Sequence, residues 1–173
     1  MSVDRTIDDK DIEILSILQA DGRTSNAEIA RQLGMAPSAI LERLRKLESR
    51  GAIRGYQARV DPHWLGLGLL AFVFVRAEEG VWARSTGEAL AAIPEVLEVH
   101  HITGEDCYLV KVRAADPEQL GHLLRERIGA IPNVRSTRST IVLGTVKEDF
   151  RLPVPGRARP SSGTEAPEEV RRG

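Results

Sequence analysis

Positively charged side chains gather in residues 37–50, where Arg43, Arg45, Lys46 and Arg50 follow one another closely. Guanidinium and ammonium groups hold DNA phosphates, and they also contact base edges in the major groove. The formal net charge of the 173-residue chain is −1, so the positive charge is local. The pattern indicates a DNA-binding surface. The alternative is a solvated helix face laced with Glu–Arg pairs, which explains the charges alone equally well.

A helix that presents these charges must bury its opposite side. Ile40, Leu44 and Leu47 recur at i, i+4 and i+7 and predict that inward face. Pro37 suits the first helical turn, where its missing N–H costs nothing. We expect the outward face to carry Ser38, Ala39, Glu42, Arg43 and Lys46.

Two shorter helices are predicted before this one. Asp8 or Asp9 caps the first, Ser25 and Glu28 form a capping box for the second, and Gly34 ends it. Only three residues then separate the second helix from the third. So tight a joint is typical of a helix-turn-helix and favours DNA binding over a merely solvated face.

Residues 52–60 read as a short hairpin, or wing, attached to the three helices. Tyr56 and Val60 are expected to pack, whereas Arg54 remains available to meet phosphates. We therefore assign a winged helix-turn-helix domain to residues 1–60.

A second domain follows an apolar connector. In the connector, residues 61–68, Trp64 is expected to pack as a hinge anchor rather than to stack on a ligand. The order βαββαβ over residues 69–148 is that of the ferredoxin-like fold, so the fold class is α+β. The predicted strands cover residues 69–76, 96–103, 107–113 and 134–147, and the helices cover residues 81–93 and a segment that Pro117 opens.

The sheet of this domain is predicted to be apolar on both faces. Residues 71–75 are apolar without alternation, and Tyr108, Val110 and Val112 are assigned to the same surface. Because the helices of a βαββαβ unit cover one face only, a second copy is expected on the bare face, which gives a homodimer. The alternative is that the connector covers this face within one chain.

Composition excludes several classes of protein. The single cysteine, Cys107, rules out an intramolecular disulfide framework and a cysteine-rich zinc site, and no metal site is expected. No apolar run approaches the ~20 residues that span a bilayer, and Met1–Lys10 is acidic, so a cytoplasmic, nucleoid-associated protein is expected. Residues 149–173, rich in proline, are expected to form a disordered tail.

Several segments together resemble one known family. They include Ile7–Leu15, Leu41–Glu48, Gly51–Tyr56 and His101–Val112. In this order they resemble the Lrp/AsnC family of feast/famine regulators across about residues 5–148. The resemblance implies a transcription regulator and not an enzyme, with a C-terminal effector domain of the RAM type.

The resemblance also implies partners and site residues. Such regulators bind double-stranded DNA, form homodimers that commonly assemble into octamers, and bind an amino acid or related small metabolite between C-terminal domains, without a cofactor. The implied DNA-binding residues are Ser25, Asn26, Ser38, Ala39, Glu42, Arg43, Lys46 and Arg54. The implied effector-binding residues are Thr103, Gly104, Glu105, Asp106, Cys107 and Tyr108, with Thr137 and Ser139 across the cleft.

The effector loop fits an amino-acid ligand chemically. Gly104 lets backbone amides approach a carboxylate, and an acidic side chain can receive the ammonium group. Taken alone, without the family resemblance, Gly104-Glu105-Asp106 is better explained as an ordinary turn that needs no ligand. Many family members have an aspartate where Cys107 stands, so the acidic contact is expected from Asp106 or Glu105.

An enzyme remains the alternative function. Siroheme decarboxylases resemble the same two-domain family, and His100 or His101 would be the proton donor. Such a site needs several cations to neutralise tetrapyrrole carboxylates, and the strands offer only Arg113 and Arg138. A packed and a surface histidine in an alternating strand is the simpler expectation. An effector-binding partner that no longer binds DNA is a third possibility, and the basic helix face argues against it.

Overall fold

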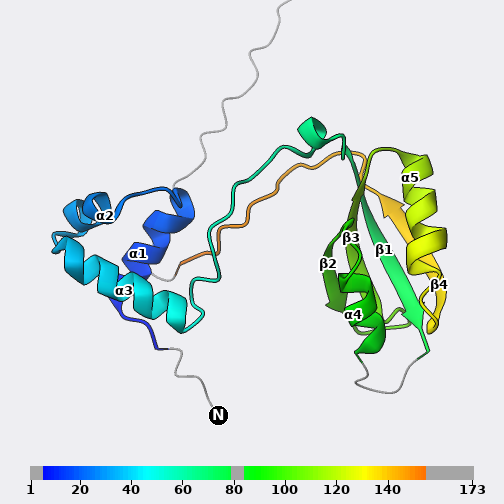
Figure 1. Cartoon of the computed structure of the whole chain (residues 1–173), viewed down its shortest axis with the longest axis horizontal. Helices are drawn as coiled ribbons and strands as arrows, with labels where there is room; N and C mark the ends of the chain where they lie inside the picture. Colours follow the sequence, from blue (N-terminus) through cyan, green and yellow to red (C-terminus); the bar gives the residue numbers. More distant parts are fainter. Residues whose placement is uncertain (1–5, 79–83, 155–173) are drawn as a thin grey trace, which may run out of the picture. The chain divides into compact units, whose positions relative to one another are not determined.

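The chain forms two compact units, which are described separately. The computed structural model describes residues 6–78 and 84–154. One unit combines the residues up to Ala58 with the described residues from Asp149 onward, and the other spans Arg59–Glu148. The first unit is helical, and the second contains the sheet (Figure 1).

The helical unit contains α1 (Asp9–Ala20), α2 (Asn26–Leu33) and α3 (Pro37–Ser49). Each helix buries one apolar face against the other two, as the periodicity predicts. The buried residues are Ile14 of α1, Ile29 and Ala30 of α2, and Ile40, Leu44 and Leu47 of α3.

The ends of the first two helices are set by local chemistry. Asp8 caps α1 by accepting a hydrogen bond from the backbone N–H of Asp11 at 2.8 Å. Gly34 ends α2 in the left-handed conformation, with φ of 64°, as predicted. Helix α1 ends at Ala20, and its C-cap is Asp21 in extended backbone.

The second unit has the predicted βαββαβ order. Its elements are β1 (Leu69–Ala77), α4 (Ser85–Ala91), β2 (Val96–His101), β3 (Tyr108–Ala114), α5 (Pro117–His122) with a π-helical turn (Leu123–Ile128), and β4 (Val134–Ile141). The strands form one antiparallel sheet in the order β2-β3-β1-β4. The predicted helix over residues 81–93 is described only from Arg84 onward. The last strand ends at Ile141 rather than at Lys147.

The two faces of the sheet differ more than the sequence suggested. Val73 and Val75 of β1 lie in the core with the buried residues of α4 and α5, whereas Phe72 and Phe74 point to the opposite, bare face. Tyr108, Val110 and Val112 of β3 are also in that core, so they do not contribute to the bare face. Instead, Phe72 pairs with Lys111 and Phe74 with Leu109, which mixes charge into the bare face.

The connector contradicts the expectation that it packs tightly. It contains a 3-10 turn, Pro62–Leu65, capped by the carboxylate of Asp61, which accepts from the His63 N–H. Trp64 is 86% exposed and Leu65 is 64% exposed, so Trp64 is not an anchor within one chain.

The segment after the sheet is partly ordered, which corrects the expectation of disorder for residues 149–154. The backbone N–H of Leu152 donates to Gln19 Oε1 at 2.6 Å, and Gln19 Nε2 donates to the Leu152 carbonyl at 3.3 Å. This pair of hydrogen bonds ties the segment to the end of α1. The rest of the predicted tail, residues 155–173, lies outside the described residues.

Candidate nucleic-acid interface and effector loop

The helix-turn-helix presents the predicted face of α3. Since Ile40, Leu44 and Leu47 are buried, the residues on the other side of α3 remain accessible. Ser38, Glu42, Arg45 and Lys46 are exposed, and Ala39 is half-buried. Among the described residues, no ion pair involves Lys46, so its ammonium group is available to a phosphate.

The start of α2 lies in the same unit and carries two further predicted residues. Ser25 is the N-cap, and its hydroxyl accepts from the Glu28 N–H at 3.2 Å. The Glu28 carboxylate points along the helix to Arg31 and Gln32, and these two partners lower the pKa of Glu28 to about 2. Ser25 is exposed and Asn26 half-buried. Half of the predicted capping box is therefore present.

Arg43 is engaged within the domain. Its Nη1 donates to Asp8 Oδ2 at 2.6 Å and to Asp11 Oδ1 at 2.7 Å, which joins α3 to α1. The side chain of Arg43 is 31% exposed and that of Asp11 only 9%. Hydrogen bonds from the Asp11 N–H and from Arg43 lower the pKa of Asp8, and hydrogen bonds to Asp8 and Asp11 raise the pKa of Arg43.

The expected wing is not a hairpin. The described chain between Gly51 and Asp61 contains no strand, although Arg54 is exposed as predicted. Tyr56 is 52% exposed and Val60 is 58% exposed, so neither packs as expected. The Tyr56 hydroxyl donates to Glu48 Oε1 at 3.1 Å, which holds the segment against the end of α3.

In the second unit, the predicted effector loop joins β2 to β3. The Ile102 N–H donates to the Cys107 carbonyl at 3.0 Å and closes the turn. Gly104 has φ of 121°, a conformation that side-chain-bearing residues rarely adopt. Thr103, Gly104 and Glu105 are exposed, so a ligand can reach the loop.

Two predicted members of the effector loop point elsewhere. The Cys107 thiol donates to the Ala77 carbonyl at 3.2 Å, and the Cys107 N–H donates to the Val75 carbonyl at 2.9 Å. Tyr108 is only 4% exposed and its ring lies against Gly87 of α4. Cys107 and Tyr108 thus secure the loop to the sheet.

Arg138 of β4 is a loop partner that the effector prediction did not include. Its Nη2 donates to Asp106 Oδ2 at 3.1 Å, and its guanidinium carbon lies 4.0 Å from the centre of the Phe74 ring. The signal was the strand register, because Arg138 pairs with Phe74 across β1 and β4. Asp106 therefore already has a cationic partner.

The structure places Thr137 and Ser139 on the outer strand β4, both exposed. Thr137 pairs with Val75, which on its other side pairs with Tyr108. Thr137 is thus on the same level of the sheet as the start of β3, where the effector loop ends. Ser139 pairs with Val73, one step further from the loop.

The two histidines considered for catalysis are both exposed, whereas one packed and one surface histidine were expected. His100 Nε2 lies 3.1 Å from Glu98 Oε2, and the His101 ring stacks on Tyr108 with centroids 5.1 Å apart. Arg138 is paired with Asp106, and Arg113 Nη1 donates to the Leu67 carbonyl at 3.3 Å. This arrangement does not resemble a cationic tetrapyrrole site.

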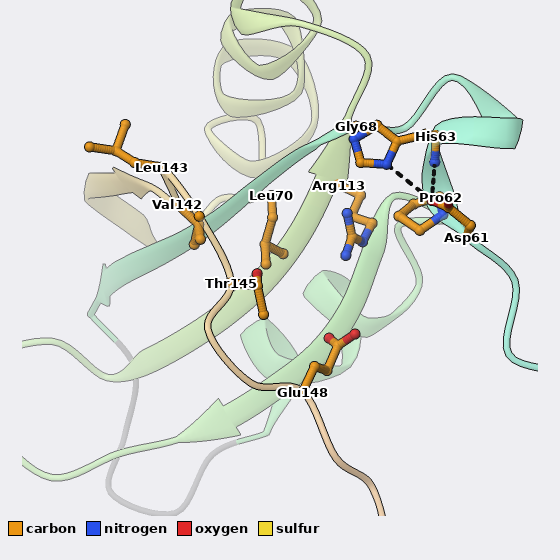
Figure 2. Close-up of a pocket in the computed structure, with 11 residues that line it drawn as sticks. Asp61, Pro62, His63, Gly68, Leu70, Arg113, Val142, Leu143, Thr145 and Glu148 are labelled. Carbon is orange, nitrogen blue, oxygen red and sulfur yellow. Dashed lines mark hydrogen bonds and ion pairs between the residues drawn. The ribbon is translucent and has the colours of Figure 1, made fainter. Parts of the chain in front are cut away.

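A groove of about 330 Å³ lies between the connector, the start of β1 and the segment after β4 (Figure 2). Arg113 and Glu148 line it, together with the Asp61–His63 pair, whose Nδ1–Oδ1 distance is 3.0 Å. Hydrogen bonds from His63 lower the pKa of Asp61. Sequence patterns did not indicate this groove, because its walls come from segments far apart in the chain.

In the part of the chain that the structure describes, no cluster of histidine, cysteine, aspartate and glutamate side chains is suited to hold a metal ion. Within the same residues, no helix is long and apolar enough to cross a membrane.

Family sequence models match both units. The AsnC-type helix-turn-helix domain matches residues 7–48, and the Lrp/AsnC ligand binding domain matches residues 70–152. An HTH-type transcriptional regulator of Pyrococcus horikoshii is 40% identical over 148 residues, covering 86% of this chain and 97% of its own. The leucine-responsive regulatory protein of Escherichia coli is 36% identical over 155 residues, covering 88% and 94%.

Solved structures agree with the sequence comparisons. A transcriptional regulator of Neisseria meningitidis in complex with L-Met superposes with a TM-score of 0.80 at 33% identity, covering 87% of this chain and 98% of its own. A feast or famine regulatory protein of M. tuberculosis complexed with L-methionine gives a TM-score of 0.79 at 39% identity, covering 87% and 100%.

Proposed function

The chain belongs to the Lrp/AsnC family of transcriptional regulators, and from that premise we propose how it contacts DNA and its effector. The exposed face of α3 enters the major groove of double-stranded DNA, while the start of α2 and the segment after α3 contact the backbone. The proposed contacts are Ser25, Asn26, Ser38, Ala39, Glu42, Lys46 and Arg54. Arg43, which Asp8 and Asp11 engage, is not among them.

One observation carries this proposal. A helix whose inward face is fully packed presents exposed polar residues on its other face, directly after a tight turn. Among the described residues, Lys46 on that face takes part in no ion pair. A charged face that was merely solvated would be expected to pair its cations with neighbouring carboxylates, as Arg31 does with Glu28 at 2.6 Å.

We further propose that the chain acts as a homodimer paired through the bare face of the sheet. Phe72, Phe74 and Leu109 are only half-buried there in a single chain, and a second copy would complete their burial. The interface would be more polar than the sequence alone suggested, because Lys111 and Arg138 share that face. Two copies would present two α3 helices to half-sites about 34–36 Å or a multiple apart, and further assembly to an octamer is part of the proposal.

The effector is proposed to be an amino acid bound at the loop of residues 103–106. Two related structures are complexes with L-methionine, which supports this ligand class. In this chain Gly104 allows close approach to backbone amides, and the ammonium group would be received by Glu105 or Asp106. Thr137 lies on the level of the sheet where the loop ends and would complete the site.

The test is an in vitro selection of bound duplexes from genomic DNA, repeated with each of a panel of amino acids, with the mass of the complexes measured. We expect enrichment of a palindromic site, dimers or multiples of dimers on it, and a shift in affinity with at least one amino acid. The region upstream of the protein's own gene is the first duplex to try. A protein that enriches no sequence would overturn the proposal.

The enzyme alternative gains no support from the relatives, which are transcriptional regulators. Of the two arginines considered for a cationic tetrapyrrole site, Arg138 is paired with Asp106 and Arg113 donates to the Leu67 carbonyl. Release of carbon dioxide from a tetrapyrrole acid by the purified protein would reverse this ranking.

A further inference from the structure

We propose that Arg43 is a positioning residue, which fixes the recognition helix α3 against α1, and not a direct DNA contact. This inference rests on the proposed DNA-binding function of α3. Asp8, Arg43 and Asp11 together form a carboxylate clamp.

The geometry of the clamp is that of a structural joint. One guanidinium nitrogen, Nη1, donates to a carboxylate oxygen of Asp8 at 2.6 Å and of Asp11 at 2.7 Å. Both distances are at the short end for charge-assisted hydrogen bonds, which are about twice as strong as neutral ones. The clamp also includes the N-cap of α1, because the same Asp8 accepts from the Asp11 N–H at 2.8 Å. Arg43 therefore connects the middle of α3 to the first turn of α1.

Burial makes the joint hard to open. Asp11 as a whole residue is only 6% exposed, so its carboxylate is largely withdrawn from water. A buried carboxylate that loses its cationic partner is left with an uncompensated charge, which is costlier than never having had the pair. If Arg43 turned toward a phosphate, the buried Asp11 carboxylate would lose its cationic partner.

Charge gives an independent argument. Two carboxylates around one guanidinium leave the clamp with a net charge of −1, so this part of α3 offers no attraction to a polyanion. Lys46 lies one helical turn further along α3, is exposed, and takes part in no ion pair among the described residues. Arg43 and Lys46 of α3 thus differ in role, because Arg43 is joined to α1 and Lys46 faces outward.

The dependence of DNA affinity on salt separates these two roles. Each phosphate contact that is lost lowers the slope of log affinity against log salt by about 0.9. Arg43→Gln is expected to weaken binding about tenfold with the slope unchanged, because the helix is misplaced but no phosphate contact is removed. Lys46→Gln, the matched control, is expected to lower the slope.

Removing a carboxylate sharpens the test. Asp11→Asn deletes a negative charge, so a direct phosphate role for Arg43 predicts equal or tighter DNA binding. The clamp predicts weaker binding, similar to that of Arg43→Gln. Asp8→Asn keeps a side chain able to cap α1 and serves as the milder variant if Asp11→Asn does not fold.

The outcomes distinguish the inference from the proposed function. A wild-type protein that binds no duplex contradicts the proposed function itself. If the wild type binds, two results would overturn the clamp. One is a lower slope of log affinity against log salt for Arg43→Gln, and the other is an unchanged affinity of the folded aspartate variant. The clamp is supported if Arg43→Gln leaves the salt slope unchanged and the aspartate variant binds DNA more weakly.

Discussion

The thiol of Cys107 donates a hydrogen bond to the backbone carbonyl of Ala77, 3.2 Å away. Cys107 precedes β3 and Ala77 ends β1, so this contact fastens the effector loop to the neighbouring strand. Many members of the family that the sequence resembles have an aspartate where Cys107 stands. In this chain its side chain is a donor directed at an acceptor, and a carboxylate could not take that role.

Cys107→Ser is expected to retain the hydrogen bond and the stability of the protein, since a hydroxyl also donates. Cys107→Asp would place an acceptor against the Ala77 carbonyl and is expected to lower the free energy of unfolding by about 1–3 kcal/mol. Chemical unfolding of the two variants in parallel provides the measurement. An aspartate variant as stable as the serine variant would show that this contact does not hold the loop.

The N-cap of α2 gives a second prediction. Ser25→Ala removes the acceptor of the Glu28 N–H and is expected to cost about 1 kcal/mol, measured by urea unfolding. Ser25→Asp keeps an acceptor at the same place and should preserve stability. If the alanine and aspartate variants unfold at the same urea concentration, the cap contributes nothing to stability.

Acid is expected to weaken the helical unit. The pKa of Asp8 is lowered below its ordinary 3.8 by the Asp11 N–H and by Arg43, and the pKa of Glu28 is lowered from 4.5 to about 2. Depressed carboxyl pKa values contribute stability that is complete above the unfolded values and is lost as pH falls through the folded ones. Thermal unfolding from pH 7 to pH 2 should therefore show stability declining below about pH 4.5.

Arg43→Gln supplies the control for the acid experiment, since it removes one cause of the lowered Asp8 pKa. Its stability should fall less steeply over the same pH interval. A wild-type stability that is level from pH 5 to pH 2 would contradict the assigned role of both carboxylates.

Gly104 is predicted to be essential for the shape of the effector loop. At φ of 121°, a β-branched side chain would strain the backbone by about 1–3 kcal/mol and move the amides that are proposed to meet the ligand. Gly104→Val should abolish the amino-acid-induced rise in melting temperature. Gly144→Val is the matched control, because Gly144 has open space around it and is not among the positive-φ glycines. Equal ligand responses in the two variants would disprove the role of Gly104.

Much of the fold could be predicted because local patterns determine it. The inward face of α3 follows from helical spacing at Ile40, Leu44 and Leu47, and the βαββαβ order follows from the alternation of element types. The exposed face of α3 was predictable for the same reason: once the buried side of a helix is known, the other side is known as well.

The predictions that are wrong concern features that contacts between distant parts of the sequence determine. Nothing local revealed that Asp8 and Asp11 would engage Arg43, some thirty residues away, or that Arg138 would reach Asp106. The sequence also did not show that Tyr108 faces the core, because an apolar run does not reveal which alternate residues point toward the helices. The predicted hairpin of the wing is wrong. The β-branched and aromatic residues at 53–60 resemble a strand, but no partner strand is present in the described chain.

The central claim is that the outward face of α3 binds duplex DNA, and the most direct measurement is the affinity for DNA from the protein's own upstream region. Lys46→Gln should weaken binding by about 1–3 kcal/mol, whereas Arg125→Gln, an exposed change in the sheet-containing unit, should leave it unaltered. Equal affinity of both variants and the wild type would contradict the account.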